Sequence, residues 1–486
     1  MTTQREPTPF EPVAGLFQLN FSPGELAERR RKVLDQIGGG IAILQGAGAA
    51  GGGSLFRQYN DFYYLCGVEV PHSYLVLDGV TRRSTLYLPH RDTLEIHDGP
   101  RLAGEDADKA VAMTGVEAVA SVSMFSLDLQ RLVLKRGAFE CYTPFAPAEQ
   151  GGTRDQLLRA RGLAATDGWA EPQAREGHLA ELFRTRFPTL QIRDLSPVLD
   201  GLRLIKSDRE IELCRRAGRL SGLAAAEAMR SSAPGVAEYE LASLAAFCFG
   251  LGGARGEGYR AIIATGHNIW FGHYGRLGDR LEEGQMVLMD FAPDVGYYTS
   301  DIGRMWPVNG KYSPLQRLLY GFMVEYHKQL LARIRPGADP ATILGQAAAS
   351  MRSVIEATEF PEPIYREAAL RALDFPGHLS HTVGMAVHDV GSYQNAPLVP
   401  GTIFAVDPQM WVPEVEMYVR VEDTVLVTND GVEVLTAAAP LELDDVEATM
   451  REDGLLPLLR SRRGDWDLDD PTISSRPPTA GGPGGG

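Results

Sequence analysis

Acidic residues inside apolar, strand-like runs constrain this chain more than any other feature of its sequence. Five carboxylates lie in such runs: Asp290 in VLMDFAP, Asp301 in YTSDIGRMW, Asp407 in FAVDPQM, and Glu422 and Asp423 in VRVEDTVLV. A buried carboxylate without a partner costs several kcal/mol. Arg304 and Arg420 are the available partners, and two arginines cannot neutralise the whole group. We therefore expect some of these acids to share bound cations.

Three histidines of the segment GHLSHTVGMAVHDVG, at 377–391, are candidate nitrogen ligands: His378, His381 and His388. Bulky and small residues alternate along the segment, which predicts a strand. On one strand the side chains of His378 and His388 would point to one face and that of His381 to the other. A three-histidine site from this segment alone is therefore not expected. Adding His381 to the acids gives an oxygen-rich set, which suits Mn²⁺, Co²⁺ or Zn²⁺ and fits two ions about 3.5–4 Å apart.

Composition narrows the class of protein. The 486 residues are 44% hydrophobic, and no apolar run reaches the roughly 18 residues of a membrane span. The net charge of −16 argues against nucleic acid or an anionic membrane as a partner. The start, MTTQREPTPFEPV, shows no secretory signal, and the four cysteines form no CxxC pair. We expect a soluble cytoplasmic protein with reduced thiols.

Helix and strand signals divide the chain into two folded parts. Strands are expected at 41–44, 73–79 and 84–90, within a smaller amino-terminal α/β domain over 25–200 that follows an extension over 1–24. Ser207 and Glu210 form a capping box ahead of a long helix, and Ser313-Pro314 and Asp339-Pro340 mark two more helix starts. These helices and several strands predict an α+β domain over 201–445. The acidic, then Pro/Gly-rich tail over 446–486 is expected to be disordered.

Five ordered motifs resemble the pita-bread metallopeptidases, the group of aminopeptidase P, prolidase and methionine aminopeptidase. They are MVLMDFAPDVGYYTSDIGRMWPVNG, GHLSHTVGMAVHDVG, VPGTIFAVDPQM, VRVEDTVLV and, upstream, GHNIWFGHYG. The segment FRQYNDFYYLCGVEVPHSYLVL is similar to the amino-terminal domain of bacterial-type aminopeptidase P. The resemblance covers roughly residues 25–440 and implies a pita-bread catalytic domain.

The resemblance also implies the site. Its metal ligands would be Asp290, Asp301, His381, Asp407 and Glu422, and its catalytic residues would be His273, His388 and Arg420. Two ions, with Mn²⁺ expected first and Co²⁺ or Zn²⁺ next, would hold a bridging hydroxide that attacks the first peptide bond of a substrate. His388 would face the substrate, and His378 would serve neither metal nor substrate. The implied substrates are peptides with proline second, and relatives are commonly homodimers or homotetramers.

Two positions depart from the family pattern. At 407 the family has glutamate in a Glu-Pro-Gly turn, whereas this chain reads Asp-Pro-Gln, so the acid is shorter by about 1.5 Å. Gly377 stands where aminopeptidase P often has a histidine. Three functions follow as hypotheses: an Xaa-Pro aminopeptidase, a prolidase restricted to dipeptides, and a catalytically weak or silent pita-bread domain that binds peptides or proteins.

Overall fold

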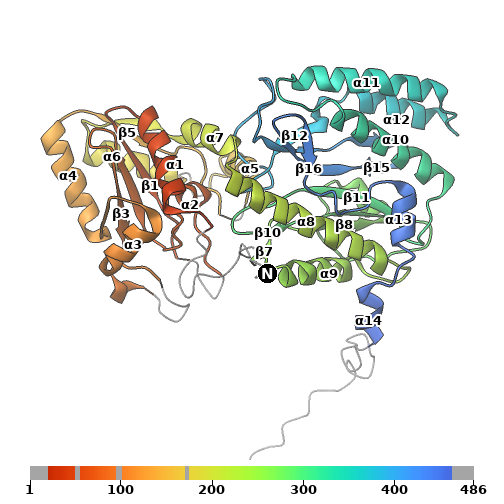
Figure 1. The fold of residues 1–486 in the computed structure, drawn as a ribbon, viewed down its shortest axis with the longest axis horizontal. Coiled ribbons are helices and arrows are strands. Elements are labelled where there is room, and N and C mark those ends of the chain that lie inside the picture. Colours follow the sequence, from red (N-terminus) through yellow and green to blue (C-terminus); the bar gives the residue numbers. More distant parts are fainter. Residues whose placement is uncertain (1–19, 50–54, 95–100, 151, 170–173, 462–486) are drawn as a thin grey trace, which may run out of the picture.

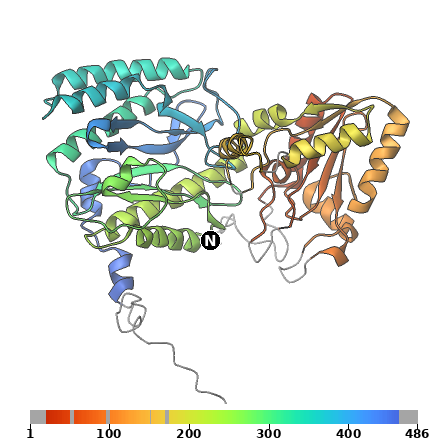
Figure 2. The same ribbon diagram turned by 180° about the vertical axis from the view of Figure 1, so that it is seen from behind.

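The computed structural model describes residues 20–49, 55–94, 101–150, 152–169 and 174–461, which form two lobes. The amino-terminal lobe, drawn in red to yellow, lies beside a larger lobe drawn in green and blue (Figure 1). The same two lobes are seen from behind in Figure 2. The extension over 1–19 and the end of the tail over 462–486 lie outside the described residues.

The amino-terminal lobe is built on a mixed six-stranded sheet with the order β4-β3-β2-β1-β5-β6. Its strands are β1 Ile41–Gln45, β2 Tyr74–Asp78, β3 Arg83–Leu88, β4 Ala118–Ser121, β5 Glu140–Thr143 and β6 Gln191–Asp194. Its helices are α1 Pro23–Gln36, α2 Asn60–Cys66, α3 Ala107–Thr114, α4 Phe125–Arg136, α5 Arg154–Ala164, α6 Arg175–Arg186 and α7 Ser196–Leu204. The three expected strands are confirmed as β1, β2 and β3. Helix α5 lies at the junction of the two lobes (Figures 1 and 2).

The larger lobe contains a seven-stranded sheet with the order β12-β13-β16-β11-β9-β8, and β17 pairs with β16. All of these pairs are antiparallel. The strands of the sheet are β8 Ile262–Thr265, β9 Met286–Asp290, β11 Ile302–Pro307, β12 Leu379–Thr382, β13 Ile403–Val406, β16 Glu422–Val427 and β17 Val432–Val434. Two further pairs are β7 Gly256–Glu257 with β10 Pro293–Asp294, and β14 Gln409–Val412 with β15 Met417–Arg420.

Helices cover this sheet on both sides. Helices α8 and α9 lie on one side and α10, α11 and α12 on the other (Figure 1). Their bounds are α8 Asp208–Ser231, α9 Glu238–Leu251, α10 Pro314–Leu331, α11 Pro340–Ala357 and α12 Pro363–Asp374. The expected starts of α8, α10 and α11 are confirmed: Ser207, Ser313 and Asp339 cap them by accepting hydrogen bonds from Glu210, Gln316 and Thr342. The expected fold class, an α/β domain followed by a pita-bread domain, is confirmed.

The chain stays folded from residue 446 to residue 461, within the segment for which the sequence predicted a disordered tail. Helix α13 covers Leu443–Thr449 and helix α14 covers Leu455–Ser461. Val446 and Leu456 are buried, and Arg460 pairs with Glu240 of α9. The acidic composition of the segment gave no sign of these contacts with the larger lobe. Among the helices of the described part, none is both long and apolar enough to span a bilayer.

Candidate metal centre

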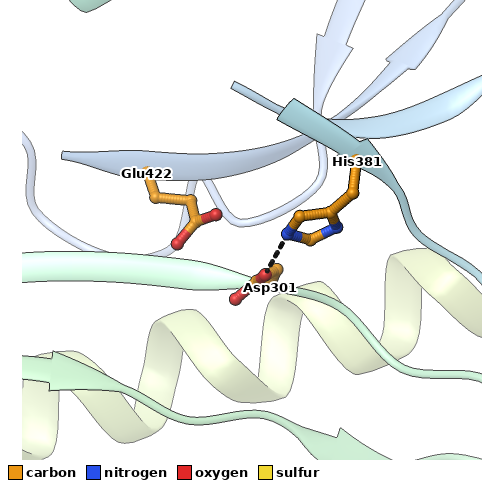
Figure 3. A group of neighbouring side chains, drawn as sticks. All are labelled: Asp301, His381 and Glu422. Carbon is orange, nitrogen blue, oxygen red and sulfur yellow. Dashed lines mark ion pairs between the residues drawn. The ribbon is translucent and has the colours of Figure 1, made fainter. Parts of the chain in front are cut away.

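Three side chains from different elements converge inside the larger lobe. Asp301 precedes β11, His381 lies on β12, and Glu422 begins β16 (Figure 3). A ligand atom from each lies within 4.8 Å of the others. The antiparallel pairing of β11 with β16 places Gly303 opposite Glu422, which brings Asp301 to the same edge of the site.

The hydrogen bonds of His381 leave one nitrogen for the centre. Its Nδ1 donates to the carbonyl of Thr382 at 3.2 Å, while its Nε2 faces Asp301 Oδ2 at 3.3 Å. Because the Nδ1 proton is committed to the carbonyl, either a second proton or a cation must lie between Nε2 and the carboxylate. A backbone partner on the outer nitrogen is what a metal-bound histidine usually has.

Asp290 joins this group through a tyrosine that the sequence did not single out. The hydroxyl of Tyr259 lies 2.6 Å from Asp290 Oδ1 and 2.9 Å from Asp301 Oδ1, so two carboxylates compete for one proton. Burial, followed by the charge of Asp290, raises the pKa of Tyr259 far above its ordinary value. In the sequence, the one indication that Tyr259 belongs to the site is its position in GEGYRAIIATG, fourteen residues before His273.

Arg420, the last residue of β15, holds the remaining acids together. Its Nε donates to Asp407 Oδ1 at 2.8 Å and its Nη1 to Asp290 Oδ2 at 2.6 Å, and it pairs with Glu422. Gln409 donates to the other oxygen of Asp407 at 3.0 Å. The structure therefore gathers all five acidic or imidazole side chains that the family resemblance implied as ligands.

The charges of the site fit a bound cation. Three carboxylates, those of Asp290, Asp407 and Glu422, share the one positive charge of Arg420, and Glu422 is fully buried with no hydrogen bond to either oxygen. Burial raises the pKa of Glu422 well above its usual range, and burial with the charge of Asp301 raises that of Asp290 to about 7. Burial opposes ionisation of Asp301 too, but the hydrogen bond and charge of His381 outweigh it and lower its pKa. Carboxylates with one imidazole suit a divalent ion such as Mn²⁺ or Zn²⁺.

The prediction of a strand through residues 383–387 is wrong, and the path of the chain explains why. β12 ends at Thr382, and residues 384–388 form a series of bends. The parity argument therefore fails beyond Thr382, and the rings of His381 and His388 come to lie 3.9 Å apart. His378 is buried beside Asp407, but both of its ring nitrogens have backbone partners: Nε2 bonds the carbonyl of Ala372 at 2.6 Å, and Nδ1 accepts from the N–H of Gln409 at 3.4 Å.

The three residues expected to be catalytic surround a cavity of about 200 Å³ that reaches Asp290 and Asp301. His273, His388 and Arg420 all line it. Burial and the charge of Arg420 lower the pKa of His273, and burial and His381 lower that of His388. Gln156 and Arg159 of α5 line the same cavity, so the amino-terminal lobe forms part of its wall.

The two departures from the family pattern have local structural reasons. A Cβ at Gly377 would lie 2.6 Å from the ring of Phe375, so a larger residue does not fit without moving that ring. At 407 the shorter side chain has partners of its own: Asp407 Oδ1 accepts from Arg420 at 2.8 Å, and Oδ2 accepts at 3.0 Å from Gln409, the residue that stands in place of the family's glycine.

Comparison with known proteins agrees with this geometry. The model of metallopeptidase family M24 matches residues 212–429, and the model of the aminopeptidase P N-terminal domain matches residues 26–141. The chain is 30% identical over 454 residues to the Xaa-Pro aminopeptidase of Escherichia coli K12, covering 88% of this chain and 97% of that protein.

Two further comparisons bear on function. The human Xaa-Pro dipeptidase is 25% identical over 501 residues, covering 90% of this chain and 93% of that protein. A solved structure of zinc-substituted E. coli aminopeptidase P in complex with product superposes with a TM-score of 0.70 at 28% identity, covering 89% and 98% of the two chains.

Proposed function

Because the chain belongs to metallopeptidase family M24 and carries an aminopeptidase P amino-terminal domain, we propose that it is an Xaa-Pro aminopeptidase. It would release the first residue of peptides that have proline second. The observation that carries the proposal is the buried group of four carboxylates and one imidazole around a single arginine, beside a cavity lined by two histidines. The relative that bears this activity in its name matches 88% of the chain.

The candidate ligands are Asp290, Asp301, His381, Asp407 and Glu422. They would hold two divalent ions, for which Mn²⁺ is the first candidate. Such ions would polarise the scissile carbonyl and lower the pKa of water. Tyr259 orients Asp290 and Asp301, and Arg420 fixes the carboxylates of Asp290 and Asp407. These contacts keep the oxygens in place before substrate enters, which is how a preorganised site lowers a barrier.

The other residues act on the peptide. His273 and His388 line the cavity and would hold the carbonyl oxygen on which negative charge develops. An oxygen of Asp407 would carry a proton to the leaving nitrogen. In a bond ahead of proline that nitrogen bears no hydrogen before cleavage, so it must gain one to leave as an amine.

A prolidase is the second candidate, since the human Xaa-Pro dipeptidase aligns over 90% of the chain. A panel of Xaa-Pro, Xaa-Pro-Xaa and Xaa-Ala peptides, assayed with added Mn²⁺, separates the two. Cleavage of Xaa-Pro-Xaa supports the aminopeptidase, and cleavage of Xaa-Pro alone supports the prolidase. No cleavage by protein that holds metal would leave a peptide-binding domain. Homo-oligomerisation and a cytoplasmic location stay predictions, to be tested by light scattering and by fractionation.

A further inference from the structure

His388 is contacted by a carboxylate from the other lobe. Its Nδ1 lies 3.2 Å from Oδ2 of Asp155, which belongs to the first turn of α5. The two residues are 233 positions apart in the chain. The side chain of His388 is 27% exposed and that of Asp155 37%, and His388 lines the cavity together with Gln156 and Arg159 of α5.

Asp155 is itself held in place. The hydroxyl of Thr153 donates to one of its oxygens, and Arg159, one turn later on α5, pairs with the other. These contacts and the charge of His388 outweigh burial, so the pKa of Asp155 is lowered and the group stays ionised. A fixed anion at Nδ1 is therefore available to the histidine at neutral pH.

The backbone beside His388 is anchored independently. Asp389 is buried and accepts from Arg203 and, at 3.2 Å, from Lys206. Arg203 also donates to Asp61 and Glu149 of the amino-terminal lobe, each at 2.7 Å. Arg203 thus ties the bend that carries His388 to the same lobe that supplies Asp155.

A carboxylate at one imidazole nitrogen selects the tautomer. A hydrogen bond to Asp155 keeps the proton on Nδ1 and leaves Nε2 as the nitrogen that can act in the cavity. The ring also lies 3.9 Å from the ring of His381, so a rotation of His388 would disturb its neighbour. Orientation of His388 therefore matters both for its own role and for the packing of the centre.

We propose that Asp155 is a positioning residue that fixes the ring and tautomer of His388, so that the amino-terminal lobe completes the catalytic group of the other lobe. The proposal rests on the proposed function for the role of His388 in hydrolysis. Its structural part, the tautomer of His388, is independent of any activity.

The structural part is tested by nitrogen NMR of full-length, zinc-loaded protein labelled with ¹⁵N-histidine. The His388 signals are assigned from their loss in His388→Gln. We expect wild-type His388 to carry its proton on Nδ1, and Asp155→Leu to shift it to a mixture of tautomers. Asp128→Leu is the matched control, because Asp128 lies on α4 of the same lobe and its side chain is 35% exposed. An unchanged His388 spectrum in Asp155→Leu would overturn the proposal.

The kinetic part uses a double-mutant cycle on an Xaa-Pro-Xaa peptide. Asp155→Leu should lower kcat about tenfold or more and change KM less than about twofold. Asp155→Asn keeps an oxygen acceptor, so its kcat should fall less than that of Asp155→Leu. In the His388→Gln background, Asp155→Leu should lower kcat less than about twofold, because Asp155 acts through that histidine. Equal losses in both backgrounds would overturn the proposal. No cleavage by wild-type protein would overturn the proposed function instead, and the NMR result would then decide the role of Asp155.

Discussion

Replacing Glu422 by glutamine should stabilise the protein in the presence of a chelator and weaken the stabilisation that it gains from metal. Glu422 is fully buried, pairs with Arg420 and accepts no hydrogen bond. An unsatisfied buried polar group costs about 1–3 kcal/mol, and more when charged. Glutamine keeps the shape and removes the charge, so we expect Glu422→Gln to raise the free energy of unfolding by about 1–3 kcal/mol in EDTA at pH 8.

The direction in which stability changes with pH follows from the pKa of Glu422, which burial raises in the folded protein. Above pH 4.5 the folded chain keeps a proton that the unfolded chain has lost. The free energy of unfolding of wild-type protein in EDTA therefore falls as pH rises from that value. Glutamine does not titrate, so the advantage of Glu422→Gln should be larger at pH 8 than at pH 5.

Added metal should reduce or reverse the difference in stability between the variant and the wild-type protein. A ligand at 100 times its Kd stabilises a folded protein by about 2.7 kcal/mol. Wild-type protein should gain about that amount when EDTA is replaced by Mn²⁺, whereas Glu422→Gln should gain less than about 1 kcal/mol. Urea denaturation, followed by the fluorescence of buried Trp306 in the larger lobe, measures both quantities.

The adjacent residue is the matched control. Asp423 is equally buried, but it accepts from Arg304 at 2.7 Å and from Thr436. Asp423→Asn should therefore lose stability in EDTA, since it leaves Arg304 without its carboxylate, and should keep the gain from Mn²⁺. If Glu422→Gln is the less stable protein in EDTA, or gains as much from Mn²⁺ as the wild type, the assignment of Glu422 is wrong.

Three further outcomes are expected. Asp301→Ala should abolish hydrolysis of Xaa-Pro peptides; full activity would remove Asp301 from the ligand group. Asp407→Glu should keep or raise kcat/KM, since it restores the length typical of the family, and a large loss would show a site adapted to aspartate. Burial lowers the pKa of His327 to about 4, so unfolded protein binds more protons between pH 6.5 and 4, and acidification across this window should cost up to ~3 kcal/mol. His327→Gln should remove that part of the pH slope in urea denaturation; an unchanged slope would contradict the shift.

The sequence predicts those features that depend on a few neighbouring residues, such as helix starts and acids within apolar strands. The caps at Ser207, Ser313 and Asp339 are read within four residues of each helix start, and each helix begins there. The acids of the sheet are likewise visible because each stands out against apolar neighbours in its own strand. Together these signals predict an α+β domain, whereas the pita-bread fold was predicted from the resemblance of the ordered motifs to a known family.

Contacts between distant segments are what the sequence does not reveal. The alternation after Thr382 looks like a strand, yet the chain bends there and sets His388 beside His381. Nothing near Asp155 in the sequence marks it as a partner of His388, because the contact joins two lobes and the residues are 233 positions apart. Tyr259 is similar: its role depends on β9 and the turn before β11 holding Asp290 and Asp301 at one hydroxyl.

Two neighbouring acids on β16, Glu422 and Asp423, differ in how well the protein satisfies their carboxylates. Side chains alternate between the two faces of a strand, so Glu422 and Asp423 point in opposite directions. Asp423 accepts hydrogen bonds from Arg304 and Thr436 at Oδ1, and its Oδ2 lies 3.2 Å from Nε2 of His327. Glu422 meets three other carboxylates and a share of Arg420, and its oxygens accept no hydrogen bond. A fold under selection for stability alone would not keep the second arrangement, because an apolar residue there would cost less. Glu422, whose one protein partner in the described structure is the shared guanidinium of Arg420, is therefore the acid that we propose as a ligand of a bound cation.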